Sequence, residues 1–153
     1  MSYLIDTNVI SELRKGQRCD PNVARWFTTV ADVEIYLSVL VIGELRRGVE
    51  RIRRRDPTTA ASLEIWLKRV VKSFDSRILA VTYEVAEEWG RMNALTPLST
   101  IDSLMAATAR VHGFTLVTRN VKDIVNAGVS YLNPFESSGR SGYRENPSNC
   151  RPE

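Results

Sequence analysis

The sequence predicts an α/β fold in which a mainly parallel sheet carries helices on both faces. Two observations favour this class. Short β-type runs alternate with longer segments of helical periodicity along the chain, and strands separated by helices imply right-handed βαβ crossovers. The length of 153 residues, of which 43% are apolar and 25% charged, fits one domain that can bury its own core.

The first half of the chain contains two expected strands and three expected helices. These are a strand over 3–5, a helix over 7–14, a helix over 21–29, a strand over 35–38 and a helix over 39–54. Asp6 stands directly before the first helix, where its carboxylate can serve as the N-cap. Pro21 suits the first turn of the second helix, and we expect Trp26 and Phe27 to be buried on its apolar side.

The second half continues the alternation of strands and helices. A helix that opens at Pro57 has an apolar stripe that includes Trp66. Thr82 is expected to cap the next helix, and Thr100 the one after it, which should end at Gly113. The remaining expected elements are strands over 78–81, 115–118 and 129–131 and a turn of helix over 122–125.

The sequence also predicts where the domain ends and where the protein acts. Residues 1–136 form the expected domain, and the polar, Gly-, Pro- and Ser-rich residues 137–153 are expected to be a disordered tail. No window approaches the 18 apolar residues of a membrane span, and the first residues lack the basic segment of a signal peptide. Cys19 and Cys150 lie far apart and match no zinc-binding spacing. We therefore expect a cytoplasmic protein that has no contact with a membrane.

Positive charge is concentrated in one short segment. Six arginines and one glutamate between residues 46 and 55 give this segment a charge of +5, so the rest of the chain sums to −2 within the net charge of +3. A basic patch on a nearly neutral body is typical of a surface that binds a polyanion. A solvated helix end, whose arginines complement the helix dipole, explains the charges equally well.

Polar residues follow two of the expected strands. Asp6 comes after the first strand, and Thr118, Arg119 and Asn120 come after the strand near residue 117. Ligands of open parallel sheets bind outside the carboxyl ends of the strands, so these side chains are candidates for a site. A helix cap for Asp6, and a plain polar turn for the other three, are the alternative interpretations.

Two further acids lie among apolar neighbours. On a helix Glu44 shares a face with Leu40 and Val41, where an ionised carboxylate is costly unless it is paired or binds a cation. An ion pair with Arg47 is the alternative. Asp102 lies in the first turn of its helix, where the dipole favours any acid.

Acids gathered at one sheet edge repel one another unless a divalent cation lies between them. Ligands that are all oxygen atoms favour Mg²⁺ or Mn²⁺ over Zn²⁺, and such ions activate water for attack on a phosphodiester. The single histidine, His112, is interpreted as structural, and the chain lacks a P-loop, a GxGxxG motif and a Gly-x-Ser-x-Gly elbow.

Four segments of the chain resemble one known family in their order and spacing. They read LIDTNVISE (4–12), SVLVIGELRRG (38–48), TIDSLMAATA (100–109) and LVTRNVKD (116–123). The sequence is similar to the PIN-domain ribonucleases, and among them to the VapC and FitB-like toxins of bacterial toxin–antitoxin pairs. The resemblance covers residues 1–135 and implies a PIN-like three-layer fold.

The resemblance also implies a set of site residues. Asp6, Glu44 and Asp102 correspond to the metal-binding acids, and Asn120 stands where the family often has a fourth acid. Asp123, three residues further on, is the other candidate for that position. Thr7 and Thr118 match polar residues that line the family's acidic pocket.

By this resemblance the protein is a Mg²⁺- or Mn²⁺-dependent endoribonuclease that acts as a toxin. Its expected partners are an RNA substrate, contacted by Arg46, Arg47 and Arg51, and a small antitoxin that adds the DNA-binding element. The family also implies a homodimer and a larger hetero-oligomer with the antitoxin.

Two other functions remain open from the sequence. An aspartyl-nucleophile phosphatase would use Asp6, but an acid is then expected two residues later, where Asn8 stands. A non-catalytic nucleic-acid-binding or regulatory subunit would keep the fold and the arginine patch without cleaving RNA.

Overall fold

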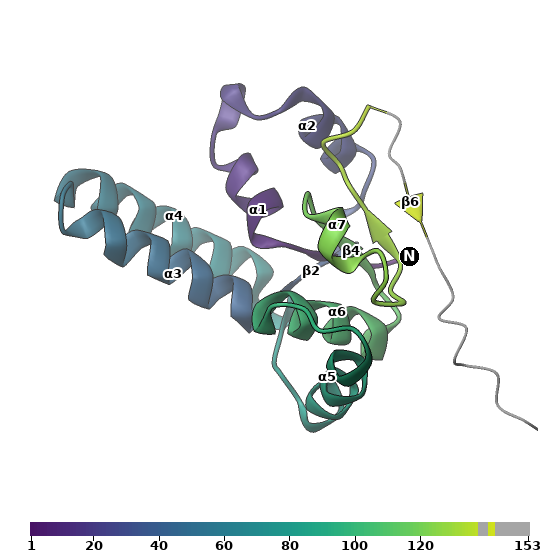
Figure 1. Cartoon of the computed structure of the whole chain (residues 1–153). Coiled ribbons are helices and arrows are strands. Elements are labelled where there is room, and N and C mark those ends of the chain that lie inside the picture. The colour runs from purple at the N-terminus through teal and green to yellow at the C-terminus, as the bar shows by residue number, and fades with distance from the viewer. Residues whose placement is uncertain (138–140, 143–153) are drawn as a thin grey trace, which may run out of the picture.

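The computed structural model describes residues 1–137 and 141–142 (Figure 1). Within them the sheet has six strands in the order β3-β2-β1-β4-β5-β6. All neighbouring strands are parallel except β5 and β6, which are antiparallel. The expected mainly parallel sheet is thereby confirmed. The strands are β1 (Tyr3–Ile5), β2 (Ile35–Ser38), β3 (Ile78–Leu79), β4 (Thr115–Val117), β5 (Tyr131–Leu132) and β6 (Ser141–Gly142).

Helices connect the parallel strands and form the outer layers. In Figure 1, α1 and α2 lie on one side of the sheet and α5 and α6 on the other, while α3 and α4 pack together as a hairpin that projects from the body. No helix in the described part of the chain has the length and apolar character needed to cross a membrane. The helices are α1 (Thr7–Leu13), α2 (Pro21–Thr28), α3 (Val39–Arg53), α4 (Pro57–Phe74), α5 (Tyr83–Leu95), α6 (Thr100–His112) and α7 (Val121–Ile124), with 3-10 turns at Gly16–Arg18, Asp32–Glu34 and Asp75–Arg77.

The central strands are apolar because both of their faces are covered. Leu4, Ile5, Leu37, Leu116 and Val117 are all buried, although they point alternately to the two sides of the sheet. Parallel strands between two helical layers have this continuous hydrophobic character. The arrangement leaves the strand ends as the places where polar side chains can gather.

The predicted N-cap of α6 is wrong by one residue. Ser99, not Thr100, is the cap, and its hydroxyl accepts a hydrogen bond from the backbone N–H of Asp102 at 3.3 Å. Thr100 is the first helical residue. Both residue types suit an N-cap, so local propensity could not choose between them.

Two other local expectations also need correction. Trp26 and Phe27 are only half-buried, because they stack edge-to-face on each other (4.9 Å between ring centroids) at the margin of the core. Strand β3 ends at Leu79 rather than at residue 81, since its ladder with β2 contains only two residue pairs.

The predicted tail contributes to the sheet at one point. Ser141 and Gly142 pair with β5, whose outer edge would otherwise carry unpaired backbone groups. These two residues, which fall within the expected tail of residues 137–153, thus form a strand. The rest of that expectation, at residues 138–140 and 143–153, lies outside the described residues.

Candidate metal and nuclease site

The carboxyl ends of three adjacent strands, β2, β1 and β4, define the candidate site. Asp6 directly follows β1, Thr118 directly follows β4, and Glu44 lies on α3, the helix that follows β2. Asp102 comes from the first turn of α6. The topology thus brings the three predicted acids to one side of the sheet.

The Asp6 carboxylate is held by three hydrogen bonds. Its Oδ1 accepts the backbone N–H of Thr7 at 2.7 Å, which confirms its role as the N-cap of α1. Its Oδ2 accepts the Thr118 hydroxyl at 2.7 Å and the Asn8 side-chain amide at 3.3 Å. Burial raises the pKa of Asp6, and the nearby carboxylates of Asp102 and Glu44 raise it further, against the hydrogen bonds that lower it. Asp6 is therefore close enough to Asp102 and Glu44 for their negative charges to disfavour its ionisation.

Glu44 is held by one hydroxyl and one guanidinium. The Thr7 hydroxyl donates to Glu44 Oε1 at 2.7 Å, and Arg47 Nη2 lies 3.5 Å from Oε2. Thr7 thus links Asp6 and Glu44, through its backbone N–H and its side chain respectively. The ion pair with Arg47, the alternative interpretation of Glu44, is present together with the link to the site.

Asp102 is fixed by the residue that caps its helix. Ser99 receives the backbone N–H of Asp102 and donates its own hydroxyl to Asp102 Oδ2 at 2.7 Å. The next residue, Ser103, is buried, and its hydroxyl accepts the indole N–H of Trp89 at 2.9 Å, which joins α6 to α5. The position of Asp102 therefore depends on Ser99, for which nothing in the sequence except capping propensity indicated a functional role.

Asn120 and Asp123 bind each other rather than the three acids. The Asn120 side-chain amide donates to Asp123 Oδ2, and the Asn120 backbone N–H donates to the Thr118 hydroxyl at 3.0 Å. Both side chains are exposed. Asn120 is thus connected to Asp6 through Thr118, and Asp123 only through Asn120.

The carboxylate oxygens of the site suit a hard divalent cation, but the three acids do not surround a common point. Among the residues that the structure describes, no three acidic, histidine or cysteine side chains are close enough together to hold a metal ion as they stand. Each of the three acids instead accepts a hydroxyl, from Thr118, Thr7 or Ser99. Because these donors are neutral, they leave negative charge around Asp6 that a cation would offset. The three carboxylates must move closer together to bind one ion.

The basic patch is partly neutralised by the neighbouring helix. Glu64 of α4 accepts hydrogen bonds from Arg46 and from Arg53, each at 2.8 Å, and these bonds lower the pKa of Glu64 to about 2. Glu50 binds the same two arginines. Arg46, one of the predicted RNA contacts, is therefore engaged in a protein ion-pair network that sequence reasoning missed.

One exposed face of α3 leads away from the site and carries arginines that Glu50 and Glu64 do not bind. Gly43, Arg47 and Arg51 recur at intervals of one turn and are exposed, and Arg51 forms no ion pair within the described residues. A Cβ atom added to Gly43 would meet nothing within 4 Å. A ligand backbone can therefore approach the helix closely beside Glu44.

Comparison with known proteins agrees with this fold. A model of the PIN domain matches residues 3–126. The VapC ribonuclease Y4jK of Sinorhizobium fredii is 29% identical over 87% of the chain and 97% of its own length. Toxin FitB of Neisseria gonorrhoeae is 30% identical over 86% and 97%.

A solved structure extends the similarity to three dimensions. The crystal structure of FitAcB from Neisseria gonorrhoeae superposes with a TM-score of 0.81 at 28% identity, covering 88% of the chain and 99% of the matched chain. The matched segment contains the strands β1, β2 and β4 and all three site acids. This chain belongs to the PIN-domain family.

Proposed function

We propose that this protein is a Mg²⁺- or Mn²⁺-dependent endoribonuclease that acts as the toxin of a toxin–antitoxin pair. The observation that carries the proposal is the buried Asp6 carboxylate, which lies near the charges of Glu44 and Asp102 and is held by neutral donors. The relatives named as a ribonuclease and as a toxin support the same activity.

Asp6, Glu44 and Asp102 would hold the ion, and the surrounding hydroxyls would orient them. A bound divalent ion supplies activated water and neutralises charge on the phosphate. Thr118, Thr7 and Ser99 each fix one carboxylate, so the acids lose little rotational freedom on loading. Asn120, which is held by Thr118, is the fourth candidate and would offer an amide oxygen.

RNA would follow the exposed face of α3. Arg47 lies 3.5 Å from Glu44 and is more than half exposed, so it can turn to a phosphate next to the site. Arg51 and Arg54 continue the track, whereas Arg53 is held by Glu64. Replacing Arg51 and Arg54 by Ala should weaken the binding of RNA of any sequence. The logarithm of the binding constant should also fall less steeply with the logarithm of the salt concentration, by the amount expected for the loss of about two phosphate contacts. The replacement Arg53→Ala serves as the control, and an equal loss of slope there would contradict the track.

The proposed partner is a small antitoxin that covers the acidic site in the cytoplasm, where RNA is available. A guanidinium or ammonium group from the antitoxin would pair with the carboxylates that surround Asp6, because clustered acids bind such groups strongly. The structural neighbour FitAB was solved bound to a DNA fragment, which is consistent with a DNA-binding element in the assembly. The DNA-binding element and the larger hetero-oligomer would come from the antitoxin.

Asn8 argues against the aspartyl-nucleophile phosphatase. Its amide donates to Asp6, and its carbonyl oxygen accepts the backbone N–H of Arg119 at 3.2 Å. Asn8 is thus a bridge between β1 and β4, and it cannot supply the acid that this mechanism needs. Nothing in the structure favours the phosphatase.

The decisive test is cleavage of structured RNA with Mg²⁺ or Mn²⁺, with and without EDTA. Asp6→Ala and Asp102→Ala should abolish cleavage without unfolding the protein, because each removes a cation ligand and relieves repulsion. Asp32→Ala, an acid in an exposed turn, is the matched control. Cleavage by either site variant at the rate of the native protein would refute the nuclease site. Intact RNA under all conditions would favour the non-catalytic binding subunit.

A further inference from the structure

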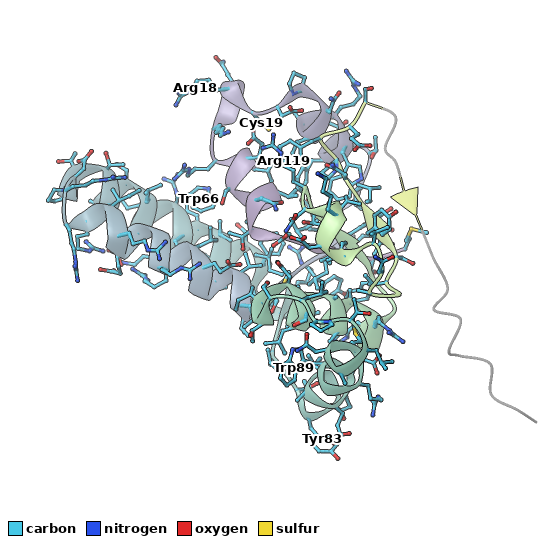
Figure 2. All side chains as sticks on the ribbon, viewed as in Figure 1. Arg18, Cys19, Trp66, Tyr83, Trp89 and Arg119 are labelled. Atoms are coloured by element: carbon cyan, nitrogen blue, oxygen red, sulfur yellow. The ribbon has the colours of Figure 1, made fainter. Side chains whose placement is uncertain are left out.

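A cavity lies between α3 and α4 at the base of their hairpin, on the side that faces away from α1. Its volume is about 310 Å³, which suits a small ligand. Residues from the first half of α3 and the second half of α4 line it, together with Asp75, which directly follows α4. Trp66 marks the opposite side of the hairpin, because the Arg14 guanidinium of α1 lies 6.0 Å from its ring centre (Figure 2). Lys68 is two residues further along α4, so it points away from Trp66 and into the cavity wall.

Two lysines of this cavity have no acid that neutralises them. The ammonium groups of Lys68 and Lys72 form no ion pair or hydrogen bond within the described residues, although they lie one turn apart, where like charges repel each other. Lys72 complements the helix dipole in the last turn of α4, but Lys68 lies outside that turn. Arg46 lines the same cavity and is fixed there by its hydrogen bond to Glu64 at 2.8 Å. A bound anion would therefore offset a repulsion that the chain itself leaves in place.

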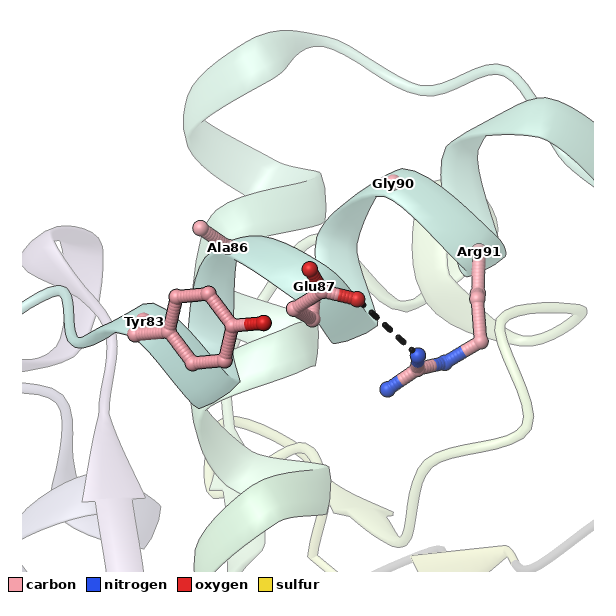
Figure 3. Close-up of a pocket in the computed structure, with 5 residues that line it drawn as sticks. All are labelled: Tyr83, Ala86, Glu87, Gly90 and Arg91. Carbon is pink, nitrogen blue, oxygen red and sulfur yellow. Dashed lines mark hydrogen bonds and ion pairs between the residues drawn. The ribbon is translucent and has the colours of Figure 1, made fainter.

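A cavity on α5 lacks this feature. It has a volume of about 510 Å³ and lies between the Tyr83 ring and the Arg91 side chain (Figure 3). Glu87 at 3.4 Å and Glu88 at 3.2 Å both form ion pairs with Arg91. The arginine of the α5 cavity is thus neutralised by its own helix, and the lysines of the α3–α4 cavity are not.

Asp75 brings an acid to the same cavity. It is exposed, and its carboxylate accepts no hydrogen bond within the described residues. Its backbone has a φ of +41° and a ψ of −108°, and no other non-glycine residue in the part of the chain that the structure describes has a positive φ. Arg77 fastens this turn by donating to the backbone oxygens of Ile35 at 2.7 Å and Ser73 at 2.9 Å. Rarely adopted backbone conformations cluster at sites that clamp ligands, so the fixed Asp75 carboxylate is well placed to contact one.

We propose that this cavity binds a ribonucleoside 5′-phosphate, either free or at the 5′ end of an RNA. The phosphate accepts hydrogen bonds from Lys68 and Lys72, and the ribose hydroxyls donate to the Asp75 carboxylate. The base packs against the apolar part of the wall, which consists of Ile42, Leu67 and Val71. About 10 Å along α4 separates Asp75 from Lys68, a distance that one mononucleotide can bridge. Such a ligand therefore uses the cations, the acid and the apolar side chains together.

The proposed ligand does not compete with a substrate at the candidate metal site. Ile42 and Arg46 line the cavity, whereas Glu44, midway between them, accepts the Thr7 hydroxyl. Residues two positions apart on a helix point in nearly opposite directions, so the cavity and the metal site lie on different faces of the same turns of α3. The proposal therefore holds whether or not the proposed nuclease function is correct.

Calorimetric titration of the full chain in EDTA tests the site. Adenosine 5′-monophosphate should bind one to one and at least about tenfold more tightly than adenosine or inorganic phosphate, because each of those lacks one group of contacts. Lys68→Glu and Lys72→Glu should each raise its Kd at least about tenfold, since an acid then faces the phosphate. Arg69→Glu is the matched control, because Arg69 is exposed on the same helix but does not line the cavity, and it should leave the Kd unchanged.

A second variant tests the ribose contact independently of the lysines. Asp75→Gly removes the carboxylate at a backbone conformation that glycine adopts readily, so a thermal melt should show a folded protein. The native protein should prefer adenosine 5′-monophosphate to its 2′-deoxy form, and Asp75→Gly should lose this preference. A preference that persists in the variant would contradict the ribose contact.

The source of the ligand is decided by competition. A short RNA with a 5′-phosphate that displaces adenosine 5′-monophosphate would identify an RNA end as the occupant, and failure to displace it would identify a free nucleotide; both outcomes support the site. Three results would each overturn the proposal: no binding of adenosine 5′-monophosphate by the native protein, a Kd unchanged by Lys68→Glu and Lys72→Glu, or an equal rise in Kd for Arg69→Glu.

Discussion

Replacing Thr118 by valine removes the hydroxyl that holds Asp6 while keeping the shape of the side chain. Thr118 is 1% exposed, and its hydroxyl donates to Asp6 Oδ2 at 2.7 Å. The Thr118 hydroxyl oxygen also accepts the backbone N–H of Asn120. Thr118→Val therefore leaves a partly buried carboxylate with one donor fewer and no room for water in its place.

The expected cost depends on the charge of Asp6. A hydrogen bond to an ionised group contributes about 1.5–3 kcal/mol, and one between neutral groups about 1 kcal/mol. Burial has already raised the pKa of Asp6, and loss of the Thr118 donor raises it further. At a pH above the raised pKa of Asp6, where the carboxylate is ionised, the unfolding free energy should fall by about 2–3 kcal/mol. At a pH below the raised pKa of Asp6, where the carboxyl group is protonated in both folded proteins, the loss should shrink towards about 1 kcal/mol.

Urea unfolding of the metal-free protein at pH 8 and at acidic pH measures this difference. Thr108→Val is the control, because Thr108 is equally buried but donates to the neutral backbone oxygen of Leu104 at 2.7 Å. The control should cost about the same at both pH values. A loss for Thr118→Val that does not change with pH, or that equals the control, would refute the view that Thr118 stabilises the charged form of Asp6.

Three further predictions concern the metal, the fourth position and the hairpin. In a thermal melt Asp6→Asn should lose the Mg²⁺-induced gain in stability, which for the native protein is about 2.7 kcal/mol at 100 times Kd. Asn120→Asp should lower the melting temperature without metal and increase the shift produced by Mg²⁺ or Mn²⁺, and if neither quantity changes, Asn120 lies outside the site. The α3–α4 hairpin should be less stable in acid, because the depressed pKa of Glu64 gives a stabilisation that is complete above the unfolded value near 4.5 and disappears as the pH falls through about 2. Glu64→Gln should remove this acid-dependent step from a pH titration followed by circular dichroism, and a step of unchanged size would assign it to another group.

The sequence by itself determined the elements and the edge at which the acids gather. Periodicity separates helices from strands within a few residues, and strands that alternate with helices must form a parallel sheet. Asp6 directly follows β1, and Asp102 lies in a first turn, so both were placed by local position alone. Glu44 was found because its apolar neighbours made an isolated charge improbable there.

The tertiary structure decided which groups the acids bind, because those partners are far away in the chain. Thr118 reaches Asp6 across 112 residues, and Thr7 reaches Glu44 across 37. Glu64 neutralises two arginines of the basic patch only because α4 folds back along α3. Hydrogen bonds and ion pairs act over a few ångströms, and the sequence does not specify which distant groups meet at that range until the chain has folded.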